Sequence, residues 1–146
     1  MSVLAKAIAF ASLKHVNQKD KGGNAYILHS LRMMMRLRTS DEELMSIAVL
    51  HDVIEDCDVS FDDLKELGMT ERVISGVQAL TRQNGETYEQ FIDRVTLNKD
   101  AMLVKREDLK DNSDLTRLKG VTEKDIARMQ KYMIAFKKID GLLKGN

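Results

Sequence analysis

The chain has 146 residues, a length that suits one compact domain able to bury roughly two-thirds of the surface exposed when it is unfolded. Its 23 basic and 23 acidic residues balance, so the whole molecule offers no net field to attract nucleic acid or an anionic membrane. The single cysteine, Cys57, excludes an intramolecular disulfide and suits a reducing compartment. No apolar run approaches the roughly 20 residues that span a bilayer. We therefore expect a cytoplasmic protein with no membrane partner.

The N-terminal part of the chain carries the periodicity of helices. Apolar residues repeat at helical spacing over about 3–16, and the paired glycines of NQKDKGGN then permit a tight turn. A second helix is expected over about 26–37. The capping-box pattern that begins at Ser40 predicts a third helix, which reaches about Ile54.

Further helix starts follow at regular intervals in the rest of the chain. Ser, Thr and Gly signals, together with the apolar run in DAMLVKREDLKDNSDL, define the remaining helices. The expected ranges are 60–68, 70–81, 87–97, 100–115 and 122–143. With no proline, no repeat and no linker-like stretch, the sequence predicts one all-α domain over residues 1–146, a bundle of about eight helices.

The segment AVLHDVIEDCDV, residues 48–59, gathers side chains that can bind a metal or move a proton at the end of the third predicted helix. His51 and Glu55 are four positions apart, as are Asp52 and Asp56, and this spacing stacks each pair along a helix. Carboxylates near a helix C-terminus oppose the helix dipole, so a nearby cation would be stabilising. The His-Asp dipeptide alone leaves an alternative open, in which His51 is a hydrogen-bonded packing residue.

Two further candidates could complete a metal site. His29 is one of only three histidines and lies in a helix expected to be largely packed, while Asp108 directly follows another apolar run. Together with His51 and Asp52 they mix nitrogen and oxygen ligands, which suits a divalent first-row metal with positions left for water and substrate. The spacing does not by itself bring the three helices together, so the four-ligand set is a hypothesis.

The order H…HD…D resembles that of the HD superfamily of metal-dependent phosphohydrolases. Three segments resemble successive signatures of the RelA/SpoT-type hydrolase domains, which remove the 3′-pyrophosphate from guanosine tetra- and pentaphosphate (ppGpp and pppGpp). These segments are AIAFASLKHVNQKDKGGNAYILHSLRMM, AVLHDVIEDCDVSFDDL and VKREDLKDNSDL. The resemblance covers about residues 5–136. It implies an all-α HD domain that hydrolyses ppGpp or a related nucleotide with a metal-activated water, with Mn²⁺ as the expected ion and a small nucleotide as the partner.

The resemblance also implies roles for individual residues. Glu55 and Asp56 resemble the acidic pair that orients the water and takes its proton. Lys19 falls where the family has a lysine near the phosphates, Asn112 resembles a residue on the nucleotide side, and Tyr132 resembles a late tyrosine near the nucleotide. The implied metal ligands are His29, His51, Asp52 and Asp108.

Departures from the family pattern bear on the substrate. Gln18 stands where the family often has an arginine, which removes one planar phosphate clamp. Ala25 and Ser30 replace prolines and concern local rigidity, and Arg106 with Glu107 replaces an apolar pair. The Gln18 change leaves a different pyrophosphorylated nucleotide open as the substrate. No synthetase pattern is present, so synthesis of ppGpp is not expected.

Two other function classes remain as alternatives. One is an HD phosphohydrolase that acts on another nucleotide, and the other is a catalytically weak module for nucleotide sensing or partner binding. The chain keeps all four expected ligands and both residues of the acidic pair, which favours an enzyme. A nucleic-acid-binding helical domain has no support from a basic face. The sequence does not define the oligomeric state.

Overall fold

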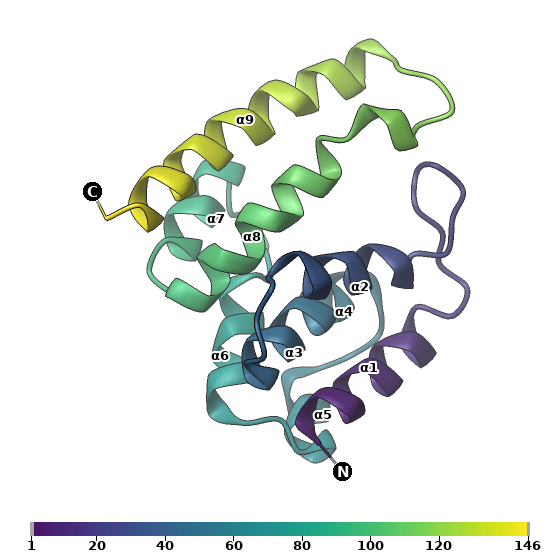
Figure 1. The fold of residues 1–146 in the computed structure, drawn as a ribbon, viewed down its shortest axis with the longest axis vertical. Helices are drawn as coiled ribbons and strands as arrows, with labels where there is room; N and C mark the ends of the chain where they lie inside the picture. Colours follow the sequence, from purple (N-terminus) through teal and green to yellow (C-terminus); the bar gives the residue numbers. More distant parts are fainter. Residues whose placement is uncertain (1, 146) are drawn as a thin grey trace.

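The computed structural model describes residues 2–145, and over these it is built from helices. Within that range no strand forms, and only an isolated antiparallel bridge joins Lys19 to Ala25. The all-α prediction is confirmed. None of the described helices is both long enough and apolar enough to cross a membrane. The elements in Figure 1 are α1 (Val3–Lys14), α2 (Ile27–Arg36), α3 (Glu42–Leu50), α4 (Val53–Asp56), α5 (Phe61–Leu67), α6 (Glu71–Ala79), α7 (Tyr88–Val95), α8 (Lys99–Asn112), the 3₁₀ helix η1 (Leu115–Arg117) and α9 (Glu123–Leu143).

Most helix starts follow from local side-chain caps. Ser60, Thr87 and Thr122 each form a complete capping box, in which the side chains at the cap and three residues later satisfy one another's backbone amides. The third helix differs from the prediction, because its cap is Asp41 rather than Ser40. The Asp41 carboxylate accepts hydrogen bonds from two backbone amides of the first turn of α3, which also favours a negative charge.

The predicted continuous helix to Ile54 is wrong, because the helix breaks between α3 and α4. In an unbroken helix the amide of Asp52 would donate to the carbonyl of Ala48. Instead, His51 Nδ1 lies 2.6 Å from that carbonyl oxygen and takes the place of the amide. Asp52 adopts φ −107° and ψ −2°, in the bridge region between helix and strand. The break allows two consecutive side chains to approach the same point.

Helix α3 forms the centre of the core. Its residues Ile47, Ala48, Val49 and Leu50 are fully buried, and α1, α2, α6 and α8 all pack against it. Gly76 allows α6 to approach closely, since a Cβ at that position would lie 2.5 Å from Ile47 Cδ1. Helix α9 then packs along α8 (Figure 1). The end of α3 is thereby held against both α2 and α8, which carry the other two candidate ligands.

Candidate metal centre and adjoining cavity

The four candidate ligands converge although they come from different elements. One ligand atom from each of His29, His51, Asp52 and Asp108 lies within 4.8 Å of all the others. Nε2 of His29 is 2.9 Å from Asp108 Oδ1, and Nε2 of His51 is 2.9 Å from Asp52 Oδ2. Both imidazoles and Asp108 are buried. The structure therefore brings together the set proposed from the sequence.

The second nitrogen of each imidazole is already engaged. Nδ1 of His51 is held by the Ala48 carbonyl, and Nδ1 of His29 lies 2.7 Å from Asp111 Oδ2. Both Nε2 atoms are buried and make no hydrogen bond of acceptable geometry. Two imidazoles fixed at Nδ1, with their Nε2 atoms turned to a pair of carboxylates, form a donor set that fits a divalent metal ion.

The charged side chains at the centre shift one another's pKa values. Burial alone would lower the pKa of His51, but Asp52 and Asp108 raise it well above its usual range. Burial alone would raise the pKa of Asp108, yet Lys105 and the two histidines hold it well below its usual range. The surroundings of these carboxylates favour their ionised form, and the carboxylate charges favour protonation of both imidazoles. Protons therefore compete with a metal ion for the two Nε2 atoms.

Three further side chains support the carboxylates. Lys105 Nζ lies 2.8 Å from Asp108 Oδ2, and Asn112 Nδ2 donates to Asp108 Oδ1 at 2.9 Å. The Tyr26 hydroxyl donates to Asp52. The roles of Lys105 and Tyr26 were missed by the sequence reasoning. The spacing of Lys105, three positions before Asp108 on one helix, was the available signal.

The acidic pair lies just beyond the ligands on α4. Asp56 accepts a hydrogen bond from Gln18 Nε2 at 3.1 Å, and Glu55 accepts one from the backbone amide of Arg82. Partial burial is the main cause that raises the pKa of each carboxyl, and the charge of Asp52 adds to it. Elevated pKa values are a frequent property of side chains that exchange protons with substrates.

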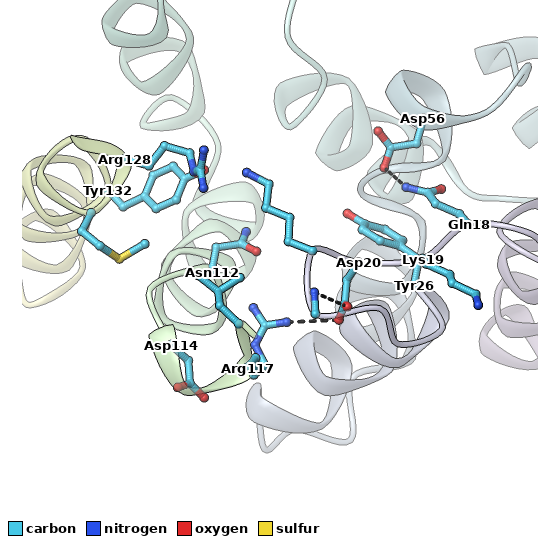
Figure 2. A pocket seen from close by; sticks show the side chains of 14 residues that line it. Gln18, Lys19, Asp20, Tyr26, Asp56, Asn112, Asp114, Arg117, Arg128 and Tyr132 are labelled. Atoms are coloured by element: carbon cyan, nitrogen blue, oxygen red, sulfur yellow. Dashed lines mark hydrogen bonds and ion pairs between the residues drawn. The ribbon is translucent and has the colours of Figure 1, made fainter. Parts of the chain in front are cut away.

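A cavity of about 320 Å³ adjoins the centre, and Asp56 is part of its wall. Figure 2 shows Arg128 and Tyr132 of α9 on one side, Gln18 and Tyr26 on the other, and Asn112 between them. Three residues expected to bind substrate, Lys19, Asn112 and Tyr132, all border this space. The other lining residues are Asp20, Lys21, Gly22, Asp114, Arg117, Leu118 and Met129.

The cavity is lined by more positively charged side chains than Lys19, the one expected from the sequence. The Lys19 side chain extends away from Asn112 in Figure 2. Lys21, Arg117 and Arg128 also line the cavity and were missed. Burial and the nearby charge of Arg128 lower the pKa of Lys21, as expected where positive charges gather. The signal in the sequence was the second lysine of KDKGGN.

The turn that carries these lysines packs tightly against η1. A Cβ at Gly22 would lie 2.3 Å from the backbone oxygen of Arg117, so only glycine fits. Gly23 adopts φ +85°, a conformation that favours glycine. Arg117 Nη1 also lies 3.4 Å from Asp20 Oδ2. These contacts fix the turn against η1.

Comparisons with known proteins agree with this arrangement. No protein-family model matches the chain. It is 32% identical to a guanosine-3′,5′-bis(diphosphate) 3′-pyrophosphohydrolase of Aquifex aeolicus, over 75% of this chain and 17% of that protein. It is 37% identical to the pyrophosphohydrolase MESH1 of Danio rerio, over 52% of this chain and 47% of that protein. The chain thus spans less than half the length of these two relatives.

Two further matches cover most of both chains. The MESH1 protein of Drosophila melanogaster is 27% identical, over 96% of this chain and 84% of its own length. A solved structure described as a metazoan ortholog of SpoT that hydrolyses ppGpp superimposes with a TM-score of 0.77 and 26% identity, over 99% of this chain and 88% of that one. These matches confirm the resemblance read from the three segments, because the chain is similar in sequence and in fold to small RelA/SpoT-like hydrolase domains.

Proposed function

We propose that the protein hydrolyses the 3′-pyrophosphate of guanosine tetraphosphate or pentaphosphate, or of a closely related nucleotide. The observation that carries this proposal is the convergence of four ligand atoms within 4.8 Å beside a cavity bordered by Asp56. Relatives named as guanosine-3′,5′-bis(diphosphate) 3′-pyrophosphohydrolases support the choice of substrate. Hydrolysis of another nucleotide by the same centre is the alternative.

The proposed ion is Mn²⁺, held by His29, His51, Asp52 and Asp108. A divalent ion supplies Lewis-acid chemistry, which activates water and offsets the charge of a pyrophosphate. In this proposal Asp56 accepts a proton from the attacking water, a role that its raised pKa and its hydrogen bond from Gln18 support. In this proposal, the neighbouring carboxylate Glu55 helps to orient that water.

The cavity supplies the groups that would hold the nucleotide. Lys21, Arg117 and Arg128 offer positive charge to phosphate oxygens, and arginine can bind them through two parallel hydrogen bonds. The Tyr132 ring and the Asn112 amide border the same space and can contact the base and sugar. The volume suits a small molecule. We include a cytoplasmic location in the proposal, consistent with the single unpaired Cys57.

The decisive experiment is an assay of the purified protein with Mn²⁺ against ppGpp, GTP and GDP. Wild type is compared with the double variant His51→Ala, Asp52→Ala, which removes two proposed ligands. We expect release of pyrophosphate from ppGpp by the wild type alone. Equal activity of the double variant would exclude this metal centre as the catalytic site. Tight binding of nucleotide with no turnover in the wild type would instead support a sensing module.

A further inference from the structure

Asp111 is a buried carboxylate that neither the sequence motif nor the proposed chemistry uses. It is fully buried and lies one turn beyond Asp108 on α8. Its Oδ2 is 2.7 Å from Nδ1 of His29, while Oδ1 of Asp108 is 2.9 Å from Nε2 of the same ring. Helix α8 therefore holds both nitrogens of one imidazole with two carboxylates three positions apart.

The two carboxylates differ in their surroundings. Asp108 faces the site where His51 and Asp52 converge. Asp111 faces three arginine side chains, with Arg32 Nε at 3.0 Å, Arg36 Nη2 at 3.3 Å and Arg117 Nη2 at 3.6 Å from its oxygens. Its charge is thus balanced without a metal ion, and the planar guanidinium of Arg32 fixes the plane of the carboxylate through a second contact of 3.3 Å.

We propose that Asp111 is a positioning residue for the metal ligand His29. An ionised carboxylate can only accept at Nδ1, so the proton of the neutral ring resides on Nδ1 and the lone pair of Nε2 is directed to the ion. Partners of this kind fix the orientation of a ligating ring and increase its basicity. The inference rests on the metal centre of the proposed function.

Arg117 links this support to the nucleotide cavity. Its Nη2 donates to the backbone oxygen of Asp111 at 2.6 Å. Its Nη1 reaches Asp20 in the turn of residues 19–24, called the glycine turn because it contains Gly22 and Gly23. The same side chain lines the cavity. The Arg117 guanidinium therefore contacts both Asp111, which lies against the ligand His29, and Asp20, in the turn that lines the cavity. Asp111 is thus connected to both parts of the site rather than being a remote ion pair.

A purely structural ion pair would contribute to folding but would leave metal affinity unchanged. The test is a calorimetric titration of metal-free protein with Mn²⁺ alone, carried out for wild type and for Asp111→Asn. We expect the variant to bind about 10- to 100-fold more weakly. The matched control is Asp140→Asn, which also removes a carboxylate paired with an arginine, Arg106 at 3.2 Å, but contacts none of the four ligands. Its affinity should equal that of wild type.

A second measurement needs no variant and keeps the inference testable if Asp111→Asn fails to fold. In wild-type protein loaded with Zn²⁺, nitrogen NMR of His29 should show a proton on Nδ1 and the ion on Nε2. Binding of the ion through Nδ1, or equal Mn²⁺ affinity of Asp111→Asn and wild type, would overturn the role of Asp111. Metal affinity that depends on Asp111 in a protein inactive on ppGpp would remove the proposed substrate and retain this inference.

Discussion

Lys105 Nζ lies 2.8 Å from Asp108 Oδ2 in a largely buried part of α8. Burial alone would lower the pKa of this lysine, but Asp108 and the neighbouring groups raise it above its usual range. The lysine is therefore charged beside a proposed metal ligand. It offsets part of the negative charge that a divalent ion would also offset.

Replacement of Lys105 by methionine should separate the stabilising effect of the lysine charge on Asp108 from that of a bound metal ion. The variant keeps a long apolar side chain but leaves Asp108 with one partner fewer. We expect the metal-free protein to lose about 1–3 kcal/mol of unfolding free energy, and Mn²⁺ to raise the melting temperature more in the variant than in wild type. Lys110→Met, which removes an exposed partner of Glu107, is the control. An equal metal-induced shift in all three proteins would contradict the expectation.

The acidic pair should be separable from metal binding. Asp56→Asn retains the shape of the side chain but cannot accept a proton, so turnover of ppGpp should fall at least about 100-fold. Mn²⁺ affinity measured by calorimetry should stay within a few-fold of wild type, because Asp56 is outside the four-atom cluster. Asp58→Asn, in the exposed turn that follows, serves as the control. A parallel loss of metal affinity in Asp56→Asn would instead make Asp56 a ligand.

Part of the stability that the fold loses as the pH falls should come from Glu86. Hydrogen bonds from Arg94 and from the Gln83 amide lower the pKa of Glu86 from its ordinary 4.5 to about 2. Because the folded-state pKa is the lower one, this contact stabilises the fold above pH 4.5 and is lost as the pH falls from 4.5 to 2. Melting temperatures of wild type and Glu86→Gln should differ most above pH 5 and converge near pH 2. A difference that is constant with pH would exclude ionisation of Glu86 as its cause.

The close approach of α6 to α3 predicts a coupled pair of core substitutions. Gly76→Ala gains about 1 kcal/mol of helix propensity, but its Cβ would meet the fully buried Ile47, and overpacking typically costs about 1–3 kcal/mol. We expect net destabilisation in urea unfolding. Ile47→Val removes the nearest atom, so the double variant should be more stable than the sum of the two single effects predicts. Strict additivity would show that Ile47 already moves aside.

Local signals explain how much of the fold was predictable. Caps at Ser60, Thr87 and Thr122 act through their own backbone neighbours, so a sequence pattern suffices to identify them. The break after α3 depends on a hydrogen bond from His51 to Ala48, which the apolar periodicity of that helix does not reveal. Periodicity continued to Ile54 and the helix did not.

The candidate site divides in the same way. The four ligands were found because their residue types and chain order carry the resemblance, although no spacing within the chain could show that they converge. Asp111 was missed because its significance depends on its distance from His29, which lies on another helix. Lys105 was missed although its spacing from Asp108 on one helix was an available signal. Lys19 was expected to bind substrate because of its position in the motif, whereas Lys21, which also lines the cavity, was not identified from the sequence.

The contact between Gly22 and Arg117 means that the residues of the candidate metal centre and those of the cavity are synthesised at different times. All four proposed ligands lie between His29 and Asp108, so the nascent chain contains the complete ligand set once α8 has been synthesised. The cavity also needs η1 to support the glycine turn and α9 to provide Tyr132. A growing chain therefore contains all four proposed ligands before it contains every residue that lines the cavity.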